Sequence, residues 1–445
     1  MRYNRIVLLL TAAAALLSSC NGGFGVIVPS FEEYNGHSVK NIELKAAHNF
    51  TSGSLPAFSE LAAEFNAENE YGFSVKLTDD NINQNSTGLD LVFCSPADAA
   101  KLLRRGMSVE LSPLITHPRW GLDSGRRIFY RAAAKQTDYF DFARKITSVP
   151  LLMNSGVVLT NSRLMQEAGI GRFPANWFSF NRILRKIGEN GSPALGLQLD
   201  TDSIVSFINA RGGSILRPIG FNYSLNNPVV NRTLRYLRRL EDDGLLSVNT
   251  VNYINQTMFT FGRLPAVFIW TDGLPHYEKL AAMTNPELNW EVNLLPTRRP
   301  GKSTVINCTY SAAVLNSSSE RELASWLFLR WLLQPEQQKR LAMKTASLPV
   351  VAEAAKLLLT DADNSGAYGS VEQVSPHWLD ALRLVDDAHK ELVPSLSDYS
   401  AVSENFSAML ERIEEGEWIW IETMKLNYRI KKMRHEENAK KAGKR

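Results

Sequence analysis

Four stretches near the start of the chain decide the fold class: residues 42–50 (IELKAAHNF), 58–65 (FSELAAEF), 71–77 (YGFSVKL) and 89–94 (LDLVFC). The second stretch repeats phenylalanine and leucine at helical spacing, whereas the others are short, largely apolar runs typical of strands. A strand, a helix and two further strands in this order predict an α/β fold with a parallel sheet covered by helices. Because ligands bind beyond the carboxyl ends of such strands, residues 50–54 and 95–98 should lie beside one crevice.

The length and composition of the chain limit the classes of protein to consider. With 445 residues, 44% hydrophobic and 21% charged, the chain is expected to fold into two or three globular domains. Its 49 Lys and Arg against 46 Asp and Glu give a net charge of +3, which does not indicate a nucleic-acid partner. Three cysteines exclude both a disulfide framework and a four-thiolate zinc site, and we expect no metal and no cofactor.

The amino terminus has the order of a secretory signal over residues 1–19. Two arginines precede an apolar run that is too short to span a bilayer, and small residues follow. Residues 17–20 (LSSC) resemble the bacterial lipoprotein box, in which the signal is cut before the cysteine and the thiol of Cys20 is lipidated. The alternative is an ordinary signal with an incidental cysteine. We expect a tether over residues 20–40 and a lipid-anchored location at the cell membrane, facing the periplasm or the cell exterior.

A series of short segments between residues 41 and 350 follows an order found in one protein family. In chain order they are 58–65, 89–92 (LDLV), 105–107 (RGM), 111–113 (LSP), 147–150 (TSVP), 159–161 (LTN), 168–170 (AGI), 173–177 (FPANW), 212–213 (GG), 226–228 (NNP), 261–267 (FGRLPAV), 295–296 (LP), 323–333, 334–338 (QPEQQ) and 347–349 (SLP). The series resembles the family of bacterial extracellular solute-binding proteins, which deliver sugars and related solutes to ABC importers. Residues 159–160 and 176–178 depart from the pattern of that family, and this bears on which sugar is bound.

The resemblance implies a periplasmic-binding-protein-like fold, with two α/β lobes joined by a multi-segment hinge that closes on a solute. The chain would cross between the lobes near residues 146–152, 303–307 and 348–353. The expected division is lobe one over 41–145 plus 306–350, lobe two over 146–305 plus 351–430, and a basic tail over 431–445. Residues 425–445 hold nine Lys or Arg and two Glu, which indicates either a solvated helix end or attraction to anionic lipid headgroups.

Sugars offer apolar C–H faces to aromatic rings and a rim of hydroxyls to polar groups. The expected ligand-binding residues at the strand ends are Phe50, Thr51, Ser95, Asp98, Trp270, Asp272, Tyr310 and Tyr399, the last by resemblance to maltose-type binders. For Trp270 the alternative is core packing at a strand end, and for Asp98 it is a turn and cap role. Trp418 and Trp420 fall on an expected carboxyl-terminal helix, where we predict core packing.

Two thiols remain besides the predicted lipidation site. Cys94 ends a buried strand of lobe one, and Cys308 begins the strand on which the chain returns to that lobe. The two strands should be neighbours in this architecture, so a disulfide between Cys94 and Cys308 is possible outside the cytoplasm. The alternative is two separate buried cysteines.

The chain lacks the sequence signatures of the common enzyme classes. It has no complete phosphate-binding loop, no paired histidines at helical spacing and no Gly-x-Ser-x-Gly motif, so we predict that it is not an enzyme. The predicted function is a lipid-anchored receptor that captures a sugar or related small polar solute and delivers it to the permease subunits of an ABC transporter. The alternative is a lipoprotein of the same fold that acts as a sensor co-receptor or adhesin without transport. A monomer without nucleic-acid partners is expected.

Overall fold

The computed structural model describes residues 41–80, 88–137, 145–188, 191–217, 223–249, 253–298, 303–364, 375–392 and 398–442. The predicted signal, the tether and Cys20 lie outside these residues. Within them, no helix is both long and apolar enough to cross a bilayer.

The first sheet follows the order that the opening stretches predict. Strands β1 (Glu43–His48), β2 (Ser74–Thr78) and β3 (Leu91–Cys94) run parallel, with β1 in the middle. Helix α2 (Leu55–Glu68) connects β1 to β2 and buries its apolar stripe, including Phe58 and Phe65, in the core. The predicted α/β class is confirmed here.

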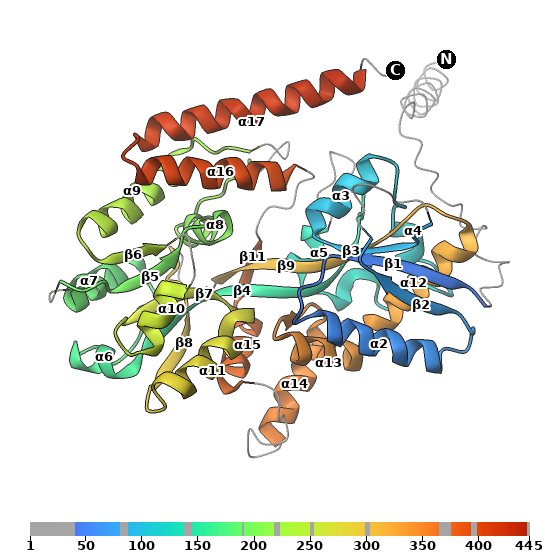
Figure 1. The fold of residues 1–445 in the computed structure, drawn as a ribbon, viewed down its shortest axis with the longest axis horizontal. Helices are drawn as coiled ribbons and strands as arrows, with labels where there is room; N and C mark the ends of the chain where they lie inside the picture. Colours follow the sequence, from blue (N-terminus) through green and yellow to red (C-terminus); the bar gives the residue numbers. More distant parts are fainter. Residues whose placement is uncertain are drawn as a thin grey trace, which may run out of the picture.

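Two long strands join this sheet to the second one. Strand β4 (Val149–Asn161) is buried over its whole length and pairs with β9 (Ser303–Val314), while its second half pairs with β7 (Ala266–Trp270) and β8 (Trp290–Leu294). With β5 (Leu195–Gln198) and β6 (Leu246–Asn249), the resulting strand order is β2-β1-β3-β9-β4-β7-β5-β6. Figure 1 shows β4 and β9 running side by side through the middle of the molecule, between the two groups of helices.

Shorter strands complete the sheets. Strand β10 (Leu348–Pro349) pairs with β4 next to the crossing, and β11 (His389–Leu392) runs parallel to the start of β9. In the second sheet β5 (Leu195–Gln198) lies between β6 (Leu246–Asn249) and β7, all three parallel. Strands β4, β9 and β10 occupy the three segments where the chain was expected to cross, whereas the predicted lobe boundaries stay a prediction.

Helices cover both sheets (Figure 1). Besides α2 they are α3 (Pro96–Arg104), α4 (Ser112–Ile115), η1 (Gly125–Ile128), α5 (Arg131–Gln136), α6 (Ser162–Glu167), α7 (Trp177–Ile187), α8 (Thr201–Ala210), α9 (Pro228–Asp242), α10 (Tyr253–Thr260), η4 (Thr271–Gly273), α11 (Leu274–Thr284), α12 (Ser319–Leu332), α13 (Pro335–Thr345), α14 (Ala352–Asn364), α15 (Pro376–Asp386), α16 (Tyr399–Glu414) and α17 (Ile419–Ala442). The last two helices pack on each other, with α17 on the outside of the molecule.

Helix α17 corrects one prediction about the core. Trp418 and Trp420 are 74% and 59% exposed, so the expectation that they pack in the core is wrong. The face of α17 that packs inward carries Leu426 and Ile430, which belong to the second hydrophobic core. Trp420 lies six residues before Leu426, and because a helix turns about 100° per residue this spacing places it on the other face.

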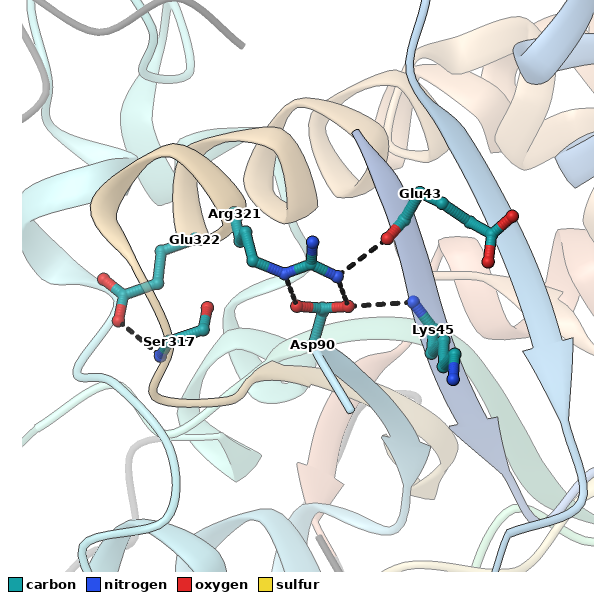
Figure 2. Close-up of polar contacts among 6 residues, drawn as sticks. All are labelled: Glu43, Lys45, Asp90, Ser317, Arg321 and Glu322. Carbon is teal, nitrogen blue, oxygen red and sulfur yellow. Dashed lines mark hydrogen bonds and ion pairs between the residues drawn. The ribbon is translucent and has the colours of Figure 1, made fainter. Parts of the chain in front are cut away.

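A buried carboxylate fastens the edge of the first sheet to α12. Asp90 is 2% exposed and accepts two hydrogen bonds of 2.6 Å from the guanidinium of Arg321, and one of 2.9 Å from the backbone N–H of Lys45. The same guanidinium donates to the backbone oxygen of Glu43 at 2.7 Å. Figure 2 shows how Asp90, directly before β3, reaches β1 and α12 at once. The aspartate of the LDLV segment therefore has a structural role.

The two cysteines do not form the disulfide that the sequence left possible. Strands β3 and β9 are neighbours as expected, but their antiparallel register sets Cys94 opposite Ser311. Cys308 lies three residues before Ser311 on β9, which is about 10 Å at 3.3 Å per residue, beyond the roughly 7 Å limit between Cα atoms for a disulfide. The odd offset also turns the two side chains to opposite faces of the sheet, where they join different core clusters. Both are buried thiols, and burial raises the pKa of each.

Candidate functional site

The candidate site is a polar row on β9 where it passes β4. Ile306, Cys308 and Tyr310 are buried on one face of β9, while Asn307 and Thr309 on the other face are only partly buried. This alternation is that of a strand with one face in the core and the other accessible to solvent. The polar face of β9 therefore opens to solvent at the point where the two sheets meet.

Asn154 links this row to the second sheet. Its Nδ2 donates to the hydroxyl of Thr309 at 2.7 Å and to the carboxylate of Asp272 at 2.9 Å. Its Oδ1 accepts from the hydroxyl of Thr271, which in turn accepts from the backbone N–H of Ser155 at 3.1 Å. Asn154 is buried in the middle of β4, so these bonds satisfy an amide that would otherwise be costly to bury.

Asp272 stands in η4, directly after β7, and is accessible to solvent. The residue is exposed, yet loss of hydration raises its pKa, against the hydrogen bonds from backbone N–H groups and from Asn154 that lower it. Asp272 can therefore accept hydrogen bonds from a bound molecule.

A second polar group meets the row at Asn307. The Asn307 amide donates to Asp202 Oδ2 at 2.9 Å, and the hydroxyl of Tyr399 donates to Asp202 Oδ1. Asp202 stands in the first turn of α8, whose N-cap is Asp200, so the helix start fixes its position. Burial raises the pKa of Asp202 to about 6 and the pKa of Tyr399 well above its usual value. Tyr399, predicted as a ligand residue, therefore lies within this group.

Phe50, Thr51 and Tyr310 form a separate group at the end of β1. The hydroxyl of Tyr310 accepts a 3.1 Å hydrogen bond from the backbone N–H of Thr51, and its ring meets the edge of Phe50 at 5.1 Å between centroids. Tyr310 is only 4% exposed, so it packs in the core and holds the loop after β1. Thr51 is exposed and Phe50 partly buried, and these two present the accessible surface of the group.

Ser95 and Asp98 cap the start of α3. A turn and cap role was the alternative to ligand binding for Asp98. The Ser95 hydroxyl accepts from the backbone N–H of Asp98 at the start of α3 and donates to the Asp98 carboxylate at 2.7 Å. Both side chains are partly buried, and their part in binding stays a prediction.

Trp270 ends β7, two residues before Asp272. Its ring is partly buried and lies edge-on to Phe268 at 6.2 Å between centroids. The contact with Phe268 fits the core alternative, while the accessible part of the ring fits contact with a ligand.

The structure thus adds four residues that were not predicted, namely Asn154, Asp202, Asn307 and Thr309. Asn154 had a readable signal, because it begins the short polar break of residues 154–156 (NSG) within an otherwise apolar run. The other three had none, since their position depends on which strand faces which helix.

Comparisons with known proteins give one family. Residues 60–366 match the model of the bacterial extracellular solute-binding protein family. A binding protein of Brucella abortus (strain 2308) is 24% identical over 285 residues, a match that covers 60% of this chain and 68% of that protein.

Solved structures with the same fold include two sugar-binding proteins. The cyclic α-maltosyl-1,6-maltose binding protein from Arthrobacter globiformis superposes with a TM-score of 0.70 at 18% identity, covering 88% of this chain and 98% of that one. The sugar-binding protein MalE from Xanthomonas citri gives a TM-score of 0.73 at 14% identity, covering 89% of this chain and 98% of that one. At these identities the likeness concerns the fold.

Proposed function

The chain belongs to the family of bacterial extracellular solute-binding proteins, and from this premise we propose that it captures a sugar or a related small polar solute and delivers it to an ABC importer. The fold is that of binding proteins, and the proposed task is recognition without reaction.

The observation that carries the proposal is the polar row of Asn307 and Thr309 with its partners from the second sheet. Amide, carboxylate and hydroxyl groups meet there within hydrogen-bond distance of one another. Such neutral and acidic groups match the hydroxyls of a sugar, which both donate and accept. The accessible parts of Phe50 and Trp270 supply rings for the apolar C–H faces of the same ligand.

The sugar class has support from proteins of the same fold. The Arthrobacter globiformis protein binds a cyclic maltosyl-maltose, and a Listeria monocytogenes substrate-binding protein with a TM-score of 0.66 is in complex with cycloalternan. Both are less than 25% identical to this chain, so they support the class of ligand and not one particular sugar.

Binding and closure of the two lobes would be coupled. Asp272 and Asp202 come from the second sheet region, whereas Thr51 and Ser95 follow strands of the first. A solute that contacts both sets binds the closed state more tightly, and this difference in affinity is what shifts a hinge equilibrium. The lipid anchor at Cys20 would keep the receptor near the importer.

A thermal-shift screen of the mature chain against sugars and polyols tests the proposal. A ligand at a hundred times its dissociation constant adds about 2.7 kcal/mol to the free energy of unfolding, which raises the melting temperature measurably. Asp272→Asn should remove most of the shift, because it removes the charged acceptor of the site. Asp242→Asn, an exposed aspartate at the end of α9, is the matched control and should keep the shift. A shift that survives Asp272→Asn, or a panel with no shift at all, would count against the proposal.

A further inference from the structure

The beginning of α17 carries an unusual exposed aromatic surface. Trp418, Trp420, Met424 and Tyr428 are 74%, 59%, 43% and 70% exposed. The last three recur every four residues, so they form one stripe along the helix. The opposite face packs on α16 through Leu426 and Ile430, and the stripe therefore points away from the protein.

The same tryptophans line a hollow in the surface of the protein. It measures about 800 Å³ and lies between the start of α9 and the turn that joins α16 to α17. Pro228, Ile413 and Ile419 give it apolar walls, and Arg235 stands at its side.

Cations surround this aromatic surface on two helices. Arg232, Arg235 and Arg239 are exposed at helical spacing on α9, which packs against α17. On the part of α17 whose side chains the structure describes, the exposed Lys and Arg residues are Lys425, Arg429, Lys431 and Lys432. The acidic groups nearby are fewer than the cations. Glu417 lines the hollow, Glu415 is exposed in the turn before it, and Glu436 lies near Lys432. Glu241 and Asp242 at the end of α9 pair with Arg238, and Glu422 is buried in ion pairs. The surface is therefore positive as well as aromatic.

The asparagines in the hollow attach the start of α9 to the loop before it and to α17. The Asn227 amide donates to the backbone oxygens of Ser214 and Ser224 and accepts from two N–H groups at the start of α9. The side-chain oxygen of Asn226 accepts from Asn231 and from Thr423. What the surface still offers is rings and cations.

We propose that this surface, made of Trp418, Trp420, Met424 and Tyr428 with the exposed cations of α9 and α17, docks on a bilayer that contains anionic phospholipid. Tryptophan and tyrosine rings favour the membrane interface because one part of each is apolar and another forms hydrogen bonds. Arginine and lysine at the same level pair with lipid phosphates. The inference goes beyond the proposed function and does not depend on solute binding.

Vesicle sedimentation tests the docking. The chain from residue 20 onward, with Cys20→Ser to remove the predicted lipidation site, is mixed at low salt with phosphatidylcholine vesicles that contain or lack phosphatidylglycerol. We expect binding to the anionic vesicles, a blue shift of tryptophan emission on binding, and release by added salt. Trp418→Ala with Trp420→Ala should weaken binding at least about tenfold. The double variant Arg429→Glu with Lys432→Glu should weaken binding to the anionic vesicles by about fivefold or more for each cation replaced.

Matched controls separate this surface from general charge and hydrophobicity. Phe178→Ala removes an 80% exposed ring on α7, and Lys76→Glu with Lys135→Glu makes the same charge change on the first lobe. Both controls should bind as the parent chain does, and all variants should keep its melting temperature. Equal binding to neutral vesicles, no vesicle binding, or binding that both tryptophan replacements leave unchanged would overturn the proposal. Vesicle-free binding of an oligosaccharide that needs Trp418 and Trp420 would replace it with a sugar site.

Discussion

Replacing Asp90 by Ala is expected to destabilise the first lobe strongly, because its carboxylate joins three elements. Asp90 accepts from Arg321 on α12 and from the backbone of β1, and it directly precedes β3. The substitution leaves the Lys45 N–H without its side-chain acceptor and the Arg321 guanidinium without its counter-ion. Helix α12 follows the crossing strand β9, so the lost contacts loosen the attachment of that strand's carboxyl end.

The burial of the pair sets the size of the effect. Removing one partner of a fully buried ion pair costs about 3–5 kcal/mol. Arg321 is 35% exposed and Asp90 2%, so water takes up part of the guanidinium charge again, and we expect about 2–3 kcal/mol. Glu167→Ala is the matched control, because Arg163 and Glu167 also approach to 2.6 Å but are 63% and 56% exposed. That exposed pair should contribute less than about 1 kcal/mol.

Urea unfolding followed by tryptophan emission measures both variants. Trp326 is fully buried on α12, the helix that carries Arg321, and therefore reports unfolding around the Asp90–Arg321 pair. Asp90→Ala should lower the urea midpoint clearly, Glu167→Ala hardly at all, and Asp90→Asn should fall between them because it keeps an acceptor oxygen. Equal midpoints for Asp90→Ala and Glu167→Ala would refute the reasoning that burial, and not distance, decides the strength of the pair.

Three further predictions concern the crossing and the thiols. Burial raises the pKa of Asp202 from 3.8 to about 6, so its neutral form stabilises the fold at low pH and that contribution is lost as the pH rises through 6. Asp202→Asn should therefore flatten the pH dependence of the melting temperature between about pH 4 and 7, and an unchanged profile would contradict this assignment. Trp270→Ala and Phe50→Ala should each weaken solute binding in calorimetry by about 1–3 kcal/mol, whereas Trp418→Ala should leave it unchanged, and the reverse pattern would move the solute away from the crossing. In denaturant without reductant, Cys94 and Cys308 should both react with a thiol reagent, while reaction only after reduction would restore the disulfide.

The sequence predicted the elements well where periodicity and burial agree. The apolar stripe of residues 58–65 became α2, and the runs at 42–50 and 89–94 became neighbouring parallel strands. The three segments where the resemblance predicts a crossing overlap β4, β9 and β10, while the division into lobes stays a prediction. In each case a local pattern specifies the element, and only its end residues shift.

The sequence could not predict the register between neighbouring strands, or which face of a strand or helix packs against the rest of the protein. Cys94 and Cys308 lie on neighbouring strands as predicted, but their separation depends on a three-residue offset that no local pattern encodes. Trp420 occupies a helix as expected, yet which face of that helix meets α16 is decided by packing. Packing also decides which face of β9 is buried. The Tyr310 ring lies in the core, whereas its neighbour Thr309 lies in the polar row.

A crystal structure of the chain with the solute that gives the largest thermal shift tests the central claim most directly. We predict the solute against the polar face of β9, with hydroxyls within hydrogen-bond distance of Asp272 and Asn307 or Thr309, and a ring of Trp270 or Phe50 against its apolar face. A solute bound elsewhere, for example in the hollow beside Trp418 and Trp420, with water alone along β9, would contradict the claim.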